Sequence, residues 1–142
     1  VPHEDDEINV AGSVMYSYVQ KGAHVYCVFT TNGDYSFWAR TRMHEAWRSL
    51  QTLGVQHVIF LGYGDTSNHY PGGHWFYSPE EAVTAPSGHN ETYGCNDFPD
   101  CRQSIKTDLK DLMDDIRADI IFAVDADVHI DHRATSILFE ES

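Results

Sequence analysis

The two ends of the chain carry imidazole and carboxylate side chains at spacings typical of metal ligands. The N-terminal stretch holds His3, Asp5 and Asp6, and the C-terminal part holds His129 and His132. His3 and Asp6 are three residues apart, so a chain that leaves a strand and enters a helix can direct both toward one ion. His132 would complete a set of two histidines and one carboxylate, which leaves metal positions open for water and substrate. Asp5 and His129 would remain beside the ion for acid/base chemistry.

Such a site suits the hydrolysis of an amide, whose carbonyl is a poor electrophile and whose amine is a poor leaving group. Zinc lowers the pKa of a bound water to about 7 and polarises a carbonyl. Asp5 would then accept the proton of the water, and His129, held by Asp131, would protonate the departing amine. Simpler explanations exist for the acidic residues: Asp5 and Asp6 suit the dipole of a first helical turn, and Asp131 suits an N-cap.

The composition is that of a single acidic globular domain. The chain has 142 residues, of which 42% are hydrophobic, enough for one core. Its formal charge is −13 and its pI is near 4.8, and the nine Lys and Arg residues are scattered, which argues against nucleic-acid partners and anionic membranes. No apolar run reaches the roughly 20 residues of a membrane span and no leader is visible, so we expect a soluble, cytoplasmic protein. Of the three cysteines, Cys27 is expected to be a buried thiol, while Cys95 and Cys101 are spaced for neither a CxxC metal site nor an evident disulfide framework.

Helical and strand-like segments alternate along the chain. Apolar residues at helical spacing predict helices at about 6–21, 38–53, 104–117 and from residue 132 onward. Runs of β-branched and aromatic residues predict strands at 24–30, 58–61 and 120–124. This alternation predicts an α/β domain over residues 1–142, with a Rossmann-like parallel sheet, helices on both faces and a site at the carboxyl ends of the strands.

Two stretches depart from that regular plan. His3 should follow a first strand, yet only Val1 and Pro2 precede it, so the sequence looks truncated at its front. From Gly62 to about Arg102 the chain has no sustained period, which predicts a long loop insert at about 62–102. Loops at the carboxyl ends of strands normally set specificity, so we expect this insert to wall the substrate pocket.

Several short motifs occur in the order seen in one enzyme family. PHEDDE at residues 2–7 resembles the PHPDDE signature of the PIG-L/LmbE-like deacetylases, with Glu4 in place of the second proline. HIDHR at residues 129–133 resembles the HPDHR segment of that family, with Ile130 in place of proline. Between them stand TNGD at 31–34, RMHE at 42–45, LGV at 53–55 and LGYGD at 61–65. The resemblance spans nearly the whole chain.

The resemblance implies a Rossmann-like fold that binds zinc and removes the N-acetyl group from N-acetylglucosamine-containing substrates. It implies that the metal ligands are His3, Asp6 and His132. It further implies that Asp5 is the general base and that His129, oriented by Asp131, is the general acid or oxyanion stabiliser. Arg42 and Asp65 fall where the family contacts sugar hydroxyls.

One position departs from the family pattern in a way that affects the substrate. In one branch of the family a tyrosine two residues before the HxDH segment helps to polarise the carbonyl, whereas this chain has Asp127 there. We therefore predict a zinc-dependent N-deacetylase of a small amino-sugar substrate, with other divalent metals possible and the oligomeric state open. The alternatives are a related metallo-amidase acting on another amide such as a thiol conjugate, and a catalytically silent sugar- or nucleotide-binding module. The sequence has no GxGxxG after a strand, which argues against a nucleotide site.

Overall fold

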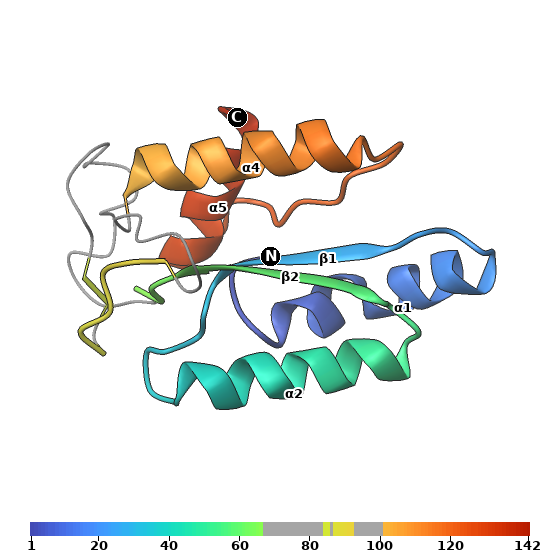
Figure 1. The fold of residues 1–142 in the computed structure, drawn as a ribbon, viewed down its shortest axis with the longest axis horizontal. Coiled ribbons are helices and arrows are strands. Elements are labelled where there is room, and N and C mark those ends of the chain that lie inside the picture. Colours follow the sequence, from blue (N-terminus) through green and yellow to red (C-terminus); the bar gives the residue numbers. More distant parts are fainter. Residues whose placement is uncertain (67–83, 86, 93–100) are drawn as a thin grey trace.

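Helices and strands alternate in the computed structural model, which describes residues 1–66, 84–85, 87–92 and 101–142. The elements are α1 (Asp6–Gln20), β1 (Tyr26–Thr31), α2 (Ala39–Thr52), β2 (His57–Tyr63), α4 (Arg102–Ile116) and α5 (Ile130–Glu140) (Figure 1). Each lies within a few residues of a predicted helix or strand. Apolar periodicity and glycine stops therefore suffice to place these six elements.

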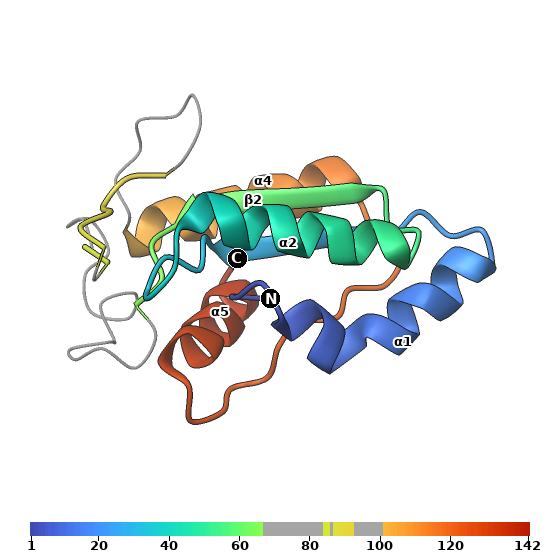
Figure 2. The same ribbon diagram turned by 90° about the horizontal axis from the view of Figure 1, so that it is seen from below.

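The two strands pair in parallel, from Tyr26 opposite His57 to Phe29 opposite Phe60. Figure 1 shows α1 and α2 on one side of the strands and α4 and α5 on the other. In the perpendicular view of Figure 2, α2 lies in front of β2 and α4 behind it. The described chain is therefore an α/β structure with helices on both faces of a parallel pair, an arrangement compatible with a Rossmann-like fold.

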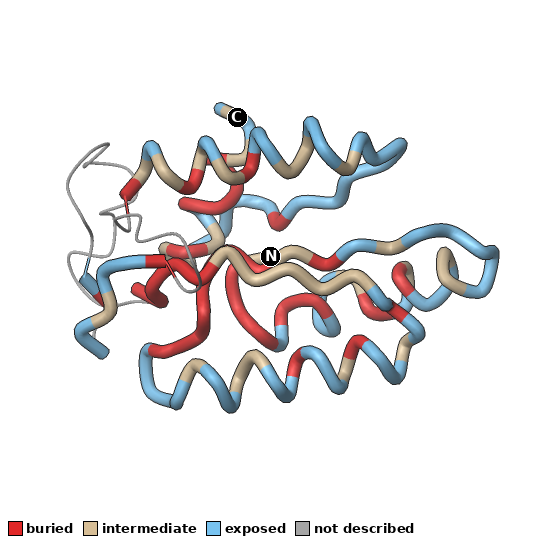
Figure 3. Tube along the Cα trace, viewed as in Figure 1, coloured by how far each residue is buried: buried red, intermediate tan, exposed pale blue. Residues whose placement is uncertain are grey.

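Two apolar clusters hold these layers together. One joins α1 and α2 to the sheet through buried residues that include Met15, Phe29 and Leu50. The other joins β2, α4 and α5, and its buried residues are Tyr63, Ile105, Leu109, Ala134 and Leu138. Buried positions also gather where β1 and β2 end and where α1 begins (Figure 3). Many residues at those ends are polar, which is unusual for a core and marks the region of the candidate site.

The predicted strand at 120–124 is wrong: residues 118–128 contain no strand. Ile120 is 56% exposed, Ile121 49% and Phe122 60%, although their sequence is typical of a buried strand. An extended segment becomes a strand only when a neighbour supplies ladder hydrogen bonds, and within the described residues the sheet consists of β1 and β2 alone. The segment has the composition of a strand and lacks the partner.

The first residues of the chain lie along β1. The Thr30 N–H donates to the Val1 carbonyl at 3.0 Å, and the Thr31 N–H donates to the Pro2 carbonyl at 3.1 Å. Val1 and Pro2 therefore occupy the place that the sequence predicts for the end of a strand before His3.

Much of the predicted insert, including its aromatic stretch at 70–77 and Cys95, lies outside the described residues. Cys27 and Cys101 are both buried free thiols, as expected for Cys27. No described helix has the length and apolar character needed to cross a membrane.

Candidate metal centre

A tight turn before α1 places the side chains of His3 and Asp6 on the same side of the backbone. The N–H groups of Asp5 and Asp6 both donate to the His3 carbonyl, at 3.1 and 3.3 Å. The Asp6 carboxylate in turn accepts the His3 backbone N–H at 2.9 Å. Because the turn closes on itself in this way, the three-residue spacing read from the sequence becomes a fixed pair of side chains.

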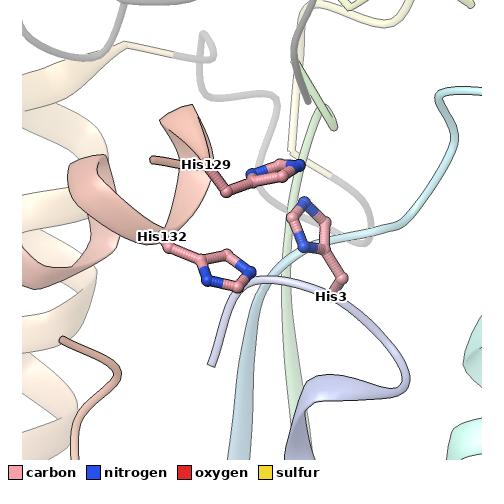
Figure 4. Close-up of side chains that lie close together, drawn as sticks. All are labelled: His3, His129 and His132. Carbon is pink, nitrogen blue, oxygen red and sulfur yellow. The ribbon is translucent and has the colours of Figure 1, made fainter. Parts of the chain in front are cut away.

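His132, on the first turn of α5, meets this pair from the opposite end of the chain. The Oδ2 atom of Asp6 lies 3.2 Å from Nδ1 of His3 and 3.3 Å from Nε2 of His132. Figure 4 shows the imidazoles of His3, His129 and His132 gathered together, with ring centroids 4.8 to 5.5 Å apart. The structure thus places Asp6 in contact with both predicted imidazoles. Among the described residues, the groups whose possible ligand atoms all lie within 4.8 Å of one another are His3 with His129 and His132, and His3 with Asp65 and Asp131.

Further carboxylates surround His3. Its Nε2 atom lies 3.1 Å from Asp131 and 3.5 Å from Asp65, and all of these residues are buried. Burial disfavours the charged imidazolium, but hydrogen bonds to Asp131, Asp6 and Asp65 outweigh it and raise the pKa of His3 to about 12. A buried group of three carboxylates favours a positive charge beside it, such as a protonated imidazole. A divalent cation bound by imidazole and carboxylate ligands meets the same requirement, so the donor set fits the zinc ion that the sequence predicts.

Asp127 is a component of the site that the sequence did not reveal as such. Its carboxylate lies 2.8 Å from Nδ1 of His132 and also accepts the His129 backbone N–H at 2.6 Å. Both contacts lower the pKa of Asp127, and the backbone hydrogen bond has the larger effect. A metal-binding histidine commonly donates its second ring N–H to a carboxylate, which fixes the tautomer and leaves the other nitrogen free to bind. The sequence marked Asp127 only as the residue that stands where one branch of the family carries a tyrosine, five positions before His132.

His129 lies beside the other two imidazoles but differs from them in its contacts. Burial first, and then the nearby positive charge of His3, lowers the pKa of His129. Its Nδ1 atom is buried and has no hydrogen-bond partner among the described residues. The expected Asp131 bond is therefore not found at this nitrogen, because Asp131 turns instead to His3 and to the Thr66 hydroxyl, which donates to it.

Asp5, the predicted base, points away from the carboxylate cluster toward α2. Its Oδ1 atom accepts a hydrogen bond from Nη2 of Arg42 at 3.1 Å, and its side chain is 64% exposed. Nε of Arg42 lies 3.8 Å from the carboxylate of Glu4, whose side chain is fully buried. Burial raises the pKa of Glu4 to about 7, against the opposing effect of Arg42. Arg42, predicted as a sugar contact, thus lies between the two acidic residues that flank the proposed site.

Asp65 follows β2 and is oriented by the turn that follows β1. Its backbone N–H donates to Oδ1 of Asp34 at 2.9 Å, and the N–H of Asp34 donates to the Asn32 side chain at 3.2 Å. Gly33, between Asn32 and Asp34 in the sequence, has a φ of +62°, and a Cβ atom at this position would overlap the Glu4 carboxylate. The TNGD turn therefore links the two strand ends and makes room for Glu4.

The described part of the insert contacts these same turns. The Ser87 hydroxyl donates to Asp34, and Nε2 of His89 lies 3.0 Å from the Gly62 carbonyl. The expectation that the whole insert walls a substrate pocket concerns mainly residues outside the described ranges.

Comparison with known proteins agrees with the motifs on which this site is built. No curated protein and no solved structure matches the chain. Residues 1–141 match the family model described as PIG-L: GlcNAc-PI de-N-acetylase. A match over this length covers the N-terminal turn, both strand ends and α5, and it shows that the chain belongs to the PIG-L family of deacetylases.

Proposed function

We propose that this protein is a zinc-dependent hydrolase that removes the N-acetyl group from a substrate containing N-acetylglucosamine. The observation that supports this most is the position of one Asp6 oxygen within 3.3 Å of both His3 and His132. A helix-dipole role for Asp6 needs no histidine from the other end of the chain. Membership of a deacetylase family supports the same type of reaction.

His3, Asp6 and His132 would hold the metal, with Asp127 keeping His132 in the binding tautomer. Bound zinc would supply a nucleophilic water at neutral pH and an electrophile for the amide carbonyl. In the present contacts the Asp6 carboxylate is shared between two imidazoles, whereas Asp5 has no contact with either. This difference supports a ligand role for Asp6, and the base role proposed for Asp5 rests on its place in the family motif.

Asp5 would take the proton from the attacking water, for which its side chain must turn from its present bond to Arg42 toward the metal ligands. His129 lies with its ring centroid 4.8 Å from those of both His3 and His132. From that position it would donate a hydrogen bond to the developing oxyanion, or a proton to the departing amine. The Asp131 carboxylate, which contacts His3, would add to the negative charge around the metal and so strengthen its binding.

The substrate assignment depends on Asp65 and Arg42. Asp65 lies beside His3 and faces the site. A residue that contacts the sugar next to the reacting amide must lie in such a position. Arg42 borders the same site through Asp5. We propose that these two side chains bind sugar hydroxyls on either side of the acetamido group.

Release of acetate from a panel of N-acetylglucosamine derivatives tests this proposal. Zinc-loaded protein should release acetate and expose one amine per turnover, and addition of a chelator should stop the release. Asp5→Asn should lower turnover by about 10²-fold or more through loss of the base. Binding of the sugars without acetate release would show a silent binding module, and release only from other amides would show the related amidase.

A further inference from the structure

Glu4 is a buried acidic residue of the N-terminal motif to which the proposed mechanism assigns no part. It stands where the signature of the family has a proline, so its side chain is a particular feature of this sequence. That side chain is fully buried, and neither of its carboxylate oxygens has a hydrogen-bond partner among the described residues. Burial of a carboxyl group without a partner costs free energy, so its presence calls for a functional explanation.

Arg42 carries a donor that is unused in the same place. Its Nε atom is buried and has no hydrogen-bond partner within the described part of the chain. This atom lies 3.8 Å from Oε2 of Glu4, which is too long for a hydrogen bond. The Nη2 atom of the same guanidinium donates instead to Oδ1 of Asp5 at 3.1 Å. Arg42 therefore lies between two carboxylates and is hydrogen-bonded to only one of them.

The planar shape of the guanidinium allows Glu4 to take the place of Asp5. Nε and Nη2 lie on the same edge of this group, and a single carboxylate can accept a hydrogen bond from each of them. Gly33 leaves space for such an approach, because a Cβ atom there would overlap the Glu4 carboxylate and lie 3.2 Å from Nε of Arg42. A shift of about 1 Å would bring Nε from 3.8 Å to hydrogen-bond distance of Glu4.

We propose that Glu4 is a positioning residue that accepts Arg42 when Asp5 turns toward the metal ligands. This inference rests on the proposed function, in which Asp5 leaves its bond to Arg42 to take a proton from water. With Glu4 as the second acceptor, the positive charge of Arg42 stays paired throughout that turn. The Nη1 group of Arg42, on the other edge of the guanidinium, remains available for the proposed sugar hydroxyl.

Removal of the Asp5 carboxylate tests this exchange without reference to activity. The Asp5 side chain is 64% exposed, so Asp5→Ala should fold. In a crystal structure of this variant, the distance from Nε of Arg42 to the Glu4 carboxylate should shorten from 3.8 Å to about 2.9 Å. Exchange of the Nε proton with water, measured by NMR, should slow by about tenfold relative to the wild type. An Arg42 side chain that stays in place or turns toward solvent would overturn the proposal.

Two double variants show whether Glu4 is the acceptor. Glutamine has the shape of glutamate but offers one acceptor oxygen, so Asp5→Ala combined with Glu4→Gln should lose the slow exchange of the Nε proton. Glu45→Gln is the matched control, because Glu45 is exposed on α2, one helical turn from Arg42. Asp5→Ala combined with Glu45→Gln should keep the slow exchange. Equal exchange rates in the two double variants would rule out Glu4 as the acceptor.

The rate of acetate release by zinc-loaded protein tests the part that Glu4 has in the reaction. Glu4→Gln should lower kcat by about tenfold when Asp5 is present, and it should have little effect in Asp5→Asn, which has no base to release. A purely structural role would lower kcat by the same factor in both backgrounds. That result, or an unchanged kcat when Asp5 is present, would overturn the proposal. If the wild type releases no acetate, the proposed function is wrong, and the NMR comparison still decides whether Arg42 moves to Glu4.

Discussion

Asp6 and Asp127 act on opposite nitrogens of the His132 ring. Asp127 lies 2.8 Å from Nδ1, and Nε2 lies 3.3 Å from Asp6. If Nδ1 carries the proton, the lone pair of Nε2 is directed toward the Asp6 oxygen and is available to a metal. We propose that this side chain, on the loop before α5, orients His132 as a metal ligand.

Replacing Asp127 with Ala should therefore weaken metal binding without removing a ligand. The expected loss is about 10- to 100-fold in zinc affinity, measured by competition with a chromogenic chelator. Asp125→Ala is the matched control, because Asp125 is exposed on the same loop and its carboxylate accepts the adjacent Ala126 N–H at 2.8 Å. Equal zinc affinities in the two variants would contradict the orienting role of Asp127.

Asp65 provides a test of the sugar contact. Asp65→Ala should lower kcat/KM for the sugar by about 1–3 kcal/mol of transition-state binding while zinc stays bound. Asp65→Asn keeps the shape and one acceptor oxygen, so it should retain part of that binding. Unchanged kinetics in the alanine variant, or loss of zinc from it, would remove Asp65 from the list of substrate contacts.

At the scale of elements, strand formation depends on neighbours more than helix formation does. The predicted helices are all present, because apolar periodicity is a local signal and Gly22 and Gly54 stop α1 and α2 with φ of +81° and +83°. The strand at 120–124 was predicted from composition alone and is absent, since its hydrogen bonds must come from another segment.

In the candidate site, too, some contacts follow from local sequence spacing and others depend on how distant segments meet. The His3–Asp6 pair follows from sequence spacing, and its meeting with His132 is expected for residues at the carboxyl ends of parallel strands. The bonds of Asp127 to His132 and of Asp131 to His3 depend on side-chain directions where α5 meets the N-terminal turn. Spacing in the sequence carries no information about those directions.

The burial of Cys27 on β1 predicts a specific pH dependence of stability. Burial raises the pKa of its thiol to about 12, whereas an unfolded thiol titrates near 8.5. Between pH ~8.5 and 12 the thiol is deprotonated in the unfolded chain and still protonated in the folded chain. The free energy of unfolding therefore falls as the pH rises through this range. Between pH 7 and 10 the free energy of unfolding should fall by about 2 kcal/mol more in the wild type than in Cys27→Ala. Urea denaturation at both pH values measures this difference, and parallel pH profiles would show that Cys27 is accessible to water.

At the scale of the whole molecule, the candidate site joins the two ends of the chain. The proposed ligand set takes His3 and Asp6 from the N-terminal turn and His132 from α5, so it would form only when both ends are folded onto the strands. Metal binding should then be coupled to folding, and the negative charge of −13 favours retention of a cation over an anion.

The most direct test of the metal centre compares the zinc content of Asp5→Asn and Asp6→Asn by elemental analysis of the purified proteins. The two residues are adjacent and the two substitutions are chemically identical, so they serve as controls for each other. Because Asp6 contacts both imidazoles and Asp5 contacts Arg42 instead, Asp5→Asn should retain about one zinc per chain, as in the wild type, and Asp6→Asn should lose it. Equal zinc content in the two variants, or loss of zinc from Asp5→Asn alone, would contradict the assignment of His3, Asp6 and His132 as the metal ligands.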